Sequence, residues 1–148
     1  MASGPQLQSP PLLPGLRWCG SKKWFVVQCV GMFFVVCCVR FYYVSSLGVA
    51  VPYWDQWDAI GWQTFRPVLA DGLSLDVLFR AHNEHWIPLT RLQSLILFWM
   101  NSDQWDPAIE MLVNAVIAGA AAAAVFATLG RHLTARNRIV FFMITSIV

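Results

Sequence analysis

The sequence is poor in charge, and the few charges that it has are unevenly placed. Charged residues make up 12% of the 148 positions, whereas hydrophobic residues make up 57%. Soluble domains carry about 25% charged residues, which cover a surface that must face water. The sequence also lacks a basic patch with interleaved aromatic residues, the usual sign of nucleic-acid binding. Composition therefore argues against a soluble domain and against a nucleic-acid partner.

Acidic residues are absent from both ends of the chain and occur only between Asp55 and Glu110. This acidic stretch is rich in tryptophan and lies between two hydrophobic blocks. The outer flanks of the blocks are basic, with Arg17, Lys22 and Lys23 before the first and Arg131, Arg136 and Arg138 after the second. Such a distribution is typical of a membrane protein with a functional loop on one face.

Cysteine is absent from the acidic stretch as well. The chain has four cysteines, Cys19, Cys29, Cys37 and Cys38, and three of them lie inside the first hydrophobic block. Cysteine in such surroundings behaves as a small buried hydrophobe. We therefore expect neither a disulfide framework nor a zinc site built from spaced cysteines.

Two segments are long and apolar enough to cross a bilayer whose hydrocarbon core is about 30 Å thick. We expect transmembrane helices over residues 24–46 and 107–130. The second helix should start after Asp106, a good N-cap, with Pro107 in the first helical position.

The rival interpretation of the first segment is a signal peptide cleaved after Ala50. A span is favoured because the apolar core is long for a signal peptide and Arg40 interrupts its end. Residues 1–23 contain several prolines and should form a flexible tail, which the basic cluster before the span places in the cytoplasm.

The apolar run over residues 87–100 decides the predicted topology. It is shorter than a span, so it suits an interfacial helix on the outer surface. Residues 47–106 then form an outer, periplasmic or extracellular loop, and the basic loop 131–138 is cytoplasmic, as the positive-inside rule favours. Residues 139–148 are expected to begin a truncated transmembrane helix, so the chain should be the N-terminal fragment of a longer protein. The predicted fold class is all-α, a multi-pass helical membrane protein with short juxtamembrane helices in its outer loop.

The outer loop contains several local signals. Asp55 and Asp58 would share one face of a helix. Asp71-Gly72 predicts a turn, and a short helix is expected over residues 74–80. The first half of the run over residues 87–100 is amphipathic, because its polar residues fall on one arc of a helical wheel: Thr90, Arg91, Gln93 and Ser94.

Two short motifs in this loop carry a resemblance to a known family. They are Tyr-Trp-Asp-Gln-Trp-Asp, ending at Asp58, and His-Asn-Glu-His-Trp-Ile-Pro-Leu, ending at Leu89. Over roughly residues 51–129 the chain resembles the N-terminal part of the GT-C superfamily of membrane glycosyltransferases. This superfamily includes the protein O-mannosyltransferases and the aminoarabinose transferase of lipid A. The chain departs from the family pattern at Gln56, where Glu is usual, and in the two residues that separate His85 from Pro88.

The resemblance implies an enzyme of the plasma membrane, the inner membrane of a bacterium, that moves a sugar from a polyprenyl-phosphate donor to an acceptor hydroxyl at the outer face. Asp55 is the first candidate for the carboxylate base and Asp58 is the second. The phosphate leaving group needs positive charge or a divalent metal nearby. The candidate substrate-binding residues are Arg66, Arg80, His82, Glu84, His85 and Arg91.

These assignments have simpler alternatives. Asp55 and Asp58 can be solvated interfacial acids or helix caps, and the arginines can contact lipid headgroups. The group around His82 and His85 lacks a known zinc spacing, so no metal site is predicted there. The whole chain can also be a non-enzymatic membrane protein, such as a transporter fragment or a subunit-binding module.

Overall fold

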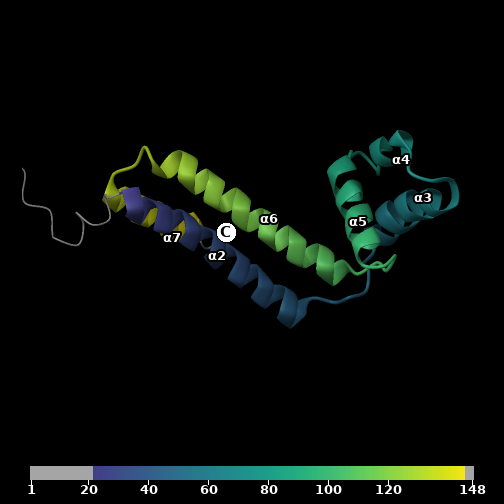
Figure 1. The fold of residues 1–148 in the computed structure, drawn as a ribbon, viewed down its shortest axis with the longest axis horizontal. Helices are drawn as coiled ribbons and strands as arrows, with labels where there is room; N and C mark the ends of the chain where they lie inside the picture. The colour runs from purple at the N-terminus through teal and green to yellow at the C-terminus, as the bar shows by residue number, and fades with distance from the viewer. Residues whose placement is uncertain (1–21, 146–148) are drawn as a thin grey trace, which may run out of the picture. The chain divides into compact units, whose positions relative to one another are not determined.

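The computed structural model describes residues 22–145 of the chain, and within them all regular secondary structure is helical. The expected tail over residues 1–21 and the last three residues lie outside the described part. The helices in order are α2 (Lys22–Leu47), η1 (Trp57–Phe65), α3 (Arg66–Asp71), α4 (Leu75–Phe79), α5 (Pro88–Met100), α6 (Pro107–Gly130) and α7 (Ala135–Thr145) (Figure 1). The predicted all-helical fold is confirmed.

Two of these helices, α2 and α6, are long and apolar enough to cross a membrane. Their most apolar windows have mean hydropathies of 2.0 and 2.1, and only 17% of each window is buried in the chain. The core helix of a soluble protein would bury most of such a surface, because exposed apolar area is unfavourable in water.

The ends of α6 follow local capping rules. The Asp106 carboxylate accepts a hydrogen bond from the Ala108 backbone N–H at 2.8 Å, and Pro107 occupies the first turn. The next helix, α7, begins at Ala135, within the stretch 131–138 that was expected to be a loop. Its start is supported by the Thr134 hydroxyl, which accepts from the Asn137 N–H. The connecting loop is therefore shorter than expected.

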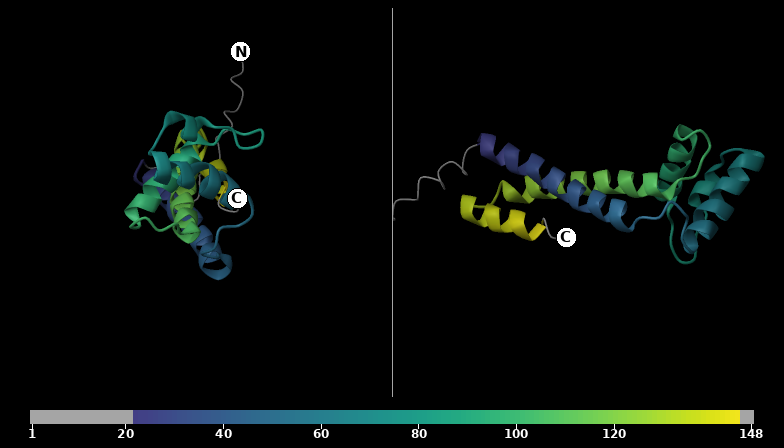
Figure 2. Two further views of the ribbon diagram at one scale, coloured as in Figure 1. Left: turned by 90° about the vertical axis from the view of Figure 1, so that its right-hand side faces the viewer. Right: turned by 90° about the horizontal axis from the view of Figure 1, so that it is seen from below.

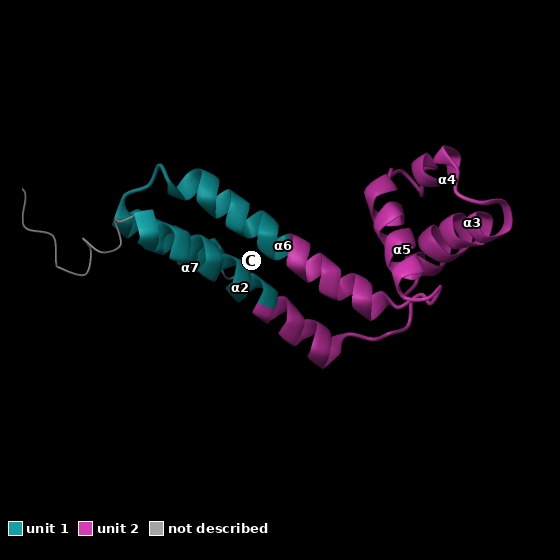
Figure 3. Cartoon of the chain, in the orientation of Figure 1, with its two compact units in different colours: residues 1–37, 118–148 teal, residues 38–117 magenta. Residues whose placement is uncertain are grey.

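The chain forms two compact units, which are described separately (Figure 3). Unit 1 consists of residues 1–37 and 118–148, and unit 2 consists of residues 38–117. Because α2 and α6 pass from one unit to the other, each unit contains part of both candidate spans.

The core of unit 1 is aromatic and centres on Phe126, whose side chain is fully buried. Its ring stacks on Phe141 with centroids 5.6 Å apart and on Phe25 at 6.1 Å. Met32 and Val36 of α2 complete this cluster. Aromatic and aliphatic contacts of this kind hold α2, α6 and α7 together within the unit.

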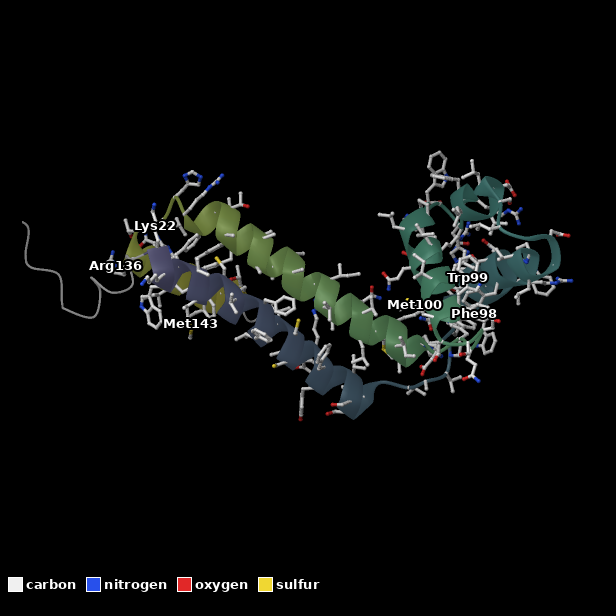
Figure 4. All side chains as sticks on the ribbon, viewed as in Figure 1. Lys22, Phe98, Trp99, Met100, Arg136 and Met143 are labelled. Atoms are coloured by element: carbon white, nitrogen blue, oxygen red, sulfur yellow. The ribbon has the colours of Figure 1, made fainter. Side chains whose placement is uncertain are left out.

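One end of unit 1 is basic, with the Lys22 and Arg136 side chains on the same end (Figure 4). The nearby Arg138 is buried, and its guanidinium donates hydrogen bonds to the carbonyls of Gly130 at 3.1 Å and Leu133 at 3.3 Å. It also lies 4.6 Å above the Phe25 ring. Arg138 thus places its cation at the C-terminal end of α6, where a positive charge is favourable.

Unit 2 contains η1, α3, α4 and α5, which lie against one another in both views of Figure 2. Its core combines side chains from all four helices: Ala59, Ile60, Phe65, Val68, Val77, Leu95 and Phe98. The closest aromatic pair joins η1 to α5, because Phe65 stacks on Phe98 with centroids 4.6 Å apart. The short α4 lies within the predicted range 74–80 and has Ser74 as its N-cap.

Candidate functional site

The first acidic motif leads directly into a π-helix. In η1 the Thr64 hydroxyl donates to the Ala59 carbonyl at 2.8 Å, five residues earlier. The Arg66 N–H likewise reaches back five residues, to the Gly61 carbonyl. π-helical turns are rare and occur often at functional sites, because the extra residue in each turn widens the helix and redirects side chains.

The residues just before η1 form a tight turn. Trp54 has a φ of 38°, a strained value for a bulky residue. The Gln56 side chain closes this turn by accepting a hydrogen bond from the Tyr53 N–H at 2.8 Å. The amide oxygen of Gln56 thus supports the backbone beside Asp55. Asp55 itself is exposed.

A pocket of about 880 Å³ lies along one side of η1. We call it the aromatic pocket, because its walls include Trp57, Trp62, Phe65, Phe98 and Trp105. Trp105 meets Trp57 edge to face at 5.3 Å and Phe65 at 5.2 Å. Its indole N–H donates to the buried Glu110 carboxylate at 3.1 Å, which fixes the ring in place.

Three charged side chains line the aromatic pocket: Asp58, Arg66 and Asp103. The Arg66 guanidinium lies 3.9 Å above the Trp62 ring, an orientation that cation–π attraction favours. Asp103 belongs to the turn after α5 and has a φ of 58°, a conformation that Asp tolerates better than most residues. The pocket thus joins two carboxylates and one guanidinium to an aromatic surface.

A second pocket, of about 560 Å³, shares the Trp62, Arg66 and Ala70 walls with the first. We call it the cationic pocket, because Arg66 and Arg80 both line it together with Gln63. Arg80 also forms an ion pair with Asp76, one turn earlier. Arg66 therefore stands between the two pockets.

Arg91 does not line the cationic pocket, but it bonds to residues that do. Its side chain is fully buried and donates hydrogen bonds to the carbonyls of Val77 and Arg80 and to the Gln63 side chain at 2.9 Å. Burial lowers the pKa of Arg91 from its ordinary value, and the neighbouring Arg80 charge lowers it further. Arg91 thus fixes two residues that line the cationic pocket, the Gln63 side chain and the Arg80 backbone.

Residues 82–85 form a tight turn that lines neither pocket. The backbone groups of His82 and His85 bond to each other in both directions, at 2.9 and 3.0 Å. Asn83 takes the left-handed conformation at the tip, and Glu84 is exposed beside it. Within residues 22–145, no three His, Cys, Asp or Glu side chains form a group that could hold a metal ion.

Of the residues predicted from the sequence, the structure gathers Asp58, Arg66 and Arg80 around the two adjoining pockets. Asp55 lines neither. Asp103 and Trp105 were not predicted as site residues, although the sequence contains a signal for them. The tetrapeptide Asp-Gln-Trp-Asp occurs twice, at residues 55–58 and 103–106, and each copy contributes one tryptophan and one aspartate to the aromatic pocket.

Fold and site together define an all-helical protein with two candidate membrane spans and an aromatic, charged pocket in the segment between them. Comparison of the chain with models of known protein families, with curated proteins and with solved structures finds no match.

Proposed function

We propose that the chain is the N-terminal part of an integral membrane glycosyltransferase of the GT-C type, in the bacterial plasma membrane. In this proposal α2 and α6 span the bilayer and the segment between them lies at the outer face. The low burial of both helices and the basic flanks of the spans support it. The packing of α2 residues Met32 and Val36 into the core of unit 1 also favours a retained span over a cleaved signal peptide.

The observation that carries the enzymatic part of the proposal is the pair of adjoining pockets. Ring faces of a sugar pack well on tryptophan, and carboxylates accept hydrogen bonds from its hydroxyls. The aromatic pocket offers both kinds of surface. The cationic pocket offers Arg66 and Arg80, whose planar guanidinium groups suit a phosphate. A sugar linked to a phosphate needs these two chemistries side by side.

The proposed reaction is one displacement. A carboxylate takes the proton of the acceptor hydroxyl while the acceptor oxygen attacks the anomeric carbon of the donor sugar. The bond between that carbon and the phosphate oxygen breaks, and the polyprenyl phosphate leaves with the electron pair. Arg66 and Arg80 stabilise the negative charge that develops on the phosphate. Asp58 is favoured over Asp55 as the base because it lines the aromatic pocket.

The other residues are placed around these steps. Asp103, across the same pocket lining, is suited to hold sugar hydroxyls. Arg91 positions Gln63 and the backbone of Arg80. We assign no step to His82, Glu84 or His85, since their turn lies outside both pockets.

The test is sugar transfer from polyprenyl-phosphate donors in membranes that contain the full-length protein. We expect donor-dependent transfer that is lost when Arg66 and Arg80 are both replaced by Gln. A protein that inserts normally but transfers no sugar from any such donor would favour the non-enzymatic alternative, a transporter fragment or a subunit-binding module.

A further inference from the structure

The exposed face of α5 is largely apolar, whereas a helix at the surface of a soluble protein exposes mainly polar side chains. The polar residues Arg91 and Ser94 of α5 are buried in unit 2. All its exposed side chains except Thr90 are apolar, and we call the apolar ones the α5 stripe: Leu89, Leu92, Ile96, Trp99 and Met100. Successive residues of a helix turn by about 100°, so these five fall within one arc of about 100°.

A hydrogen bond next to the stripe ties α5 to α6. The Gln93 side chain donates to the Asn114 side-chain oxygen at 3.0 Å. Asn114 comes seven residues after Pro107, which is about 10 Å along the helix axis at 1.5 Å per residue. The link therefore joins α5 to a point well inside α6.

The level of this link in a bilayer follows from the length of α6. The inner boundary lies at Gly130, because the basic loop begins with Arg131. A hydrocarbon core of about 30 Å takes about 20 helical residues, which reach back from Gly130 to Met111. Asn114 then lies inside the outer edge of the hydrocarbon, where a polar side chain needs a partner from a neighbouring helix. Gln93 supplies it, so α5 lies at the same level.

We propose that the α5 stripe is a lipid-facing surface, with α5 lying in the outer leaflet beside α6. This inference rests on the membrane insertion of α6 under the proposed function. Leu112 and Val116, which are exposed at the same level of α6 as Asn114, are apolar as well, and this favours acyl chains as the occupant. Trp99, near the end of α5 in Figure 4, suits the boundary between acyl chains and headgroups.

The lipid-facing stripe also determines the depth of the aromatic pocket relative to the bilayer. Phe98 of α5 stacks on Phe65 of η1, and both rings line the aromatic pocket. A helix held in the outer leaflet therefore keeps this pocket at the headgroup level. A donor whose phosphate is anchored by a lipid tail would reach the pocket without leaving the bilayer.

The test uses nitroxide labels on single cysteines of the full chain, reconstituted in phosphatidylcholine–phosphatidylglycerol vesicles, with the four native cysteines replaced by alanine. Ile96→Cys and Leu92→Cys report on the stripe. Asp76→Cys on α4 is the matched control, since it is an exposed helical position of the same unit, and Val116→Cys is the reference on α6. The collision rates of each label with lipid-soluble oxygen and with a water-soluble nickel chelate are compared.

We expect the labels at positions 92 and 96 to collide more with oxygen than with nickel, as at position 116, and the order to be reversed at position 76. Stripe labels that behave like the one at position 76 would overturn the inference, and so would labels that neither reagent reaches, because a protein partner would then cover the stripe. A lipid-exposed Val116 label in either case would leave the proposed membrane insertion standing. A water-exposed Val116 label would overturn both the membrane insertion of α6 and the lipid-facing stripe.

Discussion

At the scale of single residues, the two Asp-Gln-Trp-Asp copies show how backbone context changes the role of an identical side chain. Asp58, the last residue of the first copy, lies on η1 and lines the aromatic pocket. Asp106, the last residue of the second copy, caps the first turn of α6. The tryptophans of the two copies meet edge to face at 5.3 Å, so both copies lie at the aromatic pocket.

This contrast gives a matched pair of substitutions. Asp58→Asn removes a base and should lower sugar transfer by about 10²-fold or more. Asp106→Asn keeps an equally good N-cap and should leave transfer and expression close to normal. The measurement is transfer from a polyprenyl-phosphate donor in membranes at equal protein levels, with Asp55→Asn and Asp103→Asn alongside. Collapse in Asp55→Asn with near-normal Asp58→Asn would move the base to Asp55.

Arg91 and Arg80 make a second matched pair, one buried and one exposed. Arg91→Met keeps the aliphatic stem but leaves the Val77 and Arg80 carbonyls without their donor. We expect it to lower the free energy of unfolding by roughly 3 kcal/mol, measured by denaturant unfolding in detergent micelles. Arg80→Met breaks only an exposed ion pair and should cost about 0.5 kcal/mol.

The same two substitutions distinguish an effect on sugar transfer from an effect on stability. Under the proposed function, Arg80→Met should weaken transfer while the protein stays folded, because Arg80 lines the cationic pocket. An Arg91→Met protein as stable as the parent would contradict a stabilising role for the three hydrogen bonds that Arg91 donates.

The candidate site was only partly predictable at this scale. Asp58, Arg66 and Arg80 stood out as charged residues in one polar stretch. Asp103 belongs with them only because Trp105 packs on Trp57 and Phe65, a long-range contact that no local pattern reveals. The burial of Arg91 likewise depends on carbonyls at the end of α4, which a helical wheel of α5 does not show.

At the scale of elements, helices with local start and stop signals were predictable. The start of α6 matches the prediction because Asp106 and Pro107 act within its first turn. The π-helical form of η1 was not predictable from apolar periodicity. η1 ends at Phe65 and continues directly into α3, whose second residue, Pro67, has no backbone N–H to donate.

The packing of α2 on α6 in unit 1 makes a prediction about two glycines. A Cβ on Gly119 would lie 2.5 Å from the Cys37 sulfur, which is too close, and 3.1 Å from the Phe33 carbonyl oxygen, which is tighter than an ordinary contact. Gly119→Ala should therefore force the helices apart and destabilise the protein by about 1–3 kcal/mol. The measurement is thermal unfolding in detergent micelles.

Gly31→Ala is the control, since its Cβ would meet only the Phe142 ring, at an ordinary 3.8 Å. It should be neutral or slightly stabilising, because Ala favours a helix more than Gly does. Equal effects of the two substitutions would contradict the close contact at Gly119.

At the scale of the whole molecule, charge is divided between the two units. Unit 1 has six Lys and Arg residues and no acid, whereas unit 2 has four arginines and all eight acids. The cations of unit 1 flank the start of α2 and the end of α6, and Arg138 among them is held against the α6 terminus. Under the proposed function, the positive-inside rule predicts that the α6–α7 loop and the start of α2 lie on the cytoplasmic side.

This division predicts the topology. Single cysteines at Lys23 and Arg136 should react with a membrane-impermeant maleimide only after the cells are permeabilised. Cysteines at Asp71 and Asn101 should react in intact cells, because both residues lie between α2 and α6. Labelling of position 136 from outside, with position 23 still protected, would mean that α5 crosses the membrane and would remove the lipid-facing stripe with it. Replacing Lys22, Lys23, Arg131 and Arg136 by Gln should raise the fraction of inverted molecules, since four of the six cations that flank the two candidate spans are then removed.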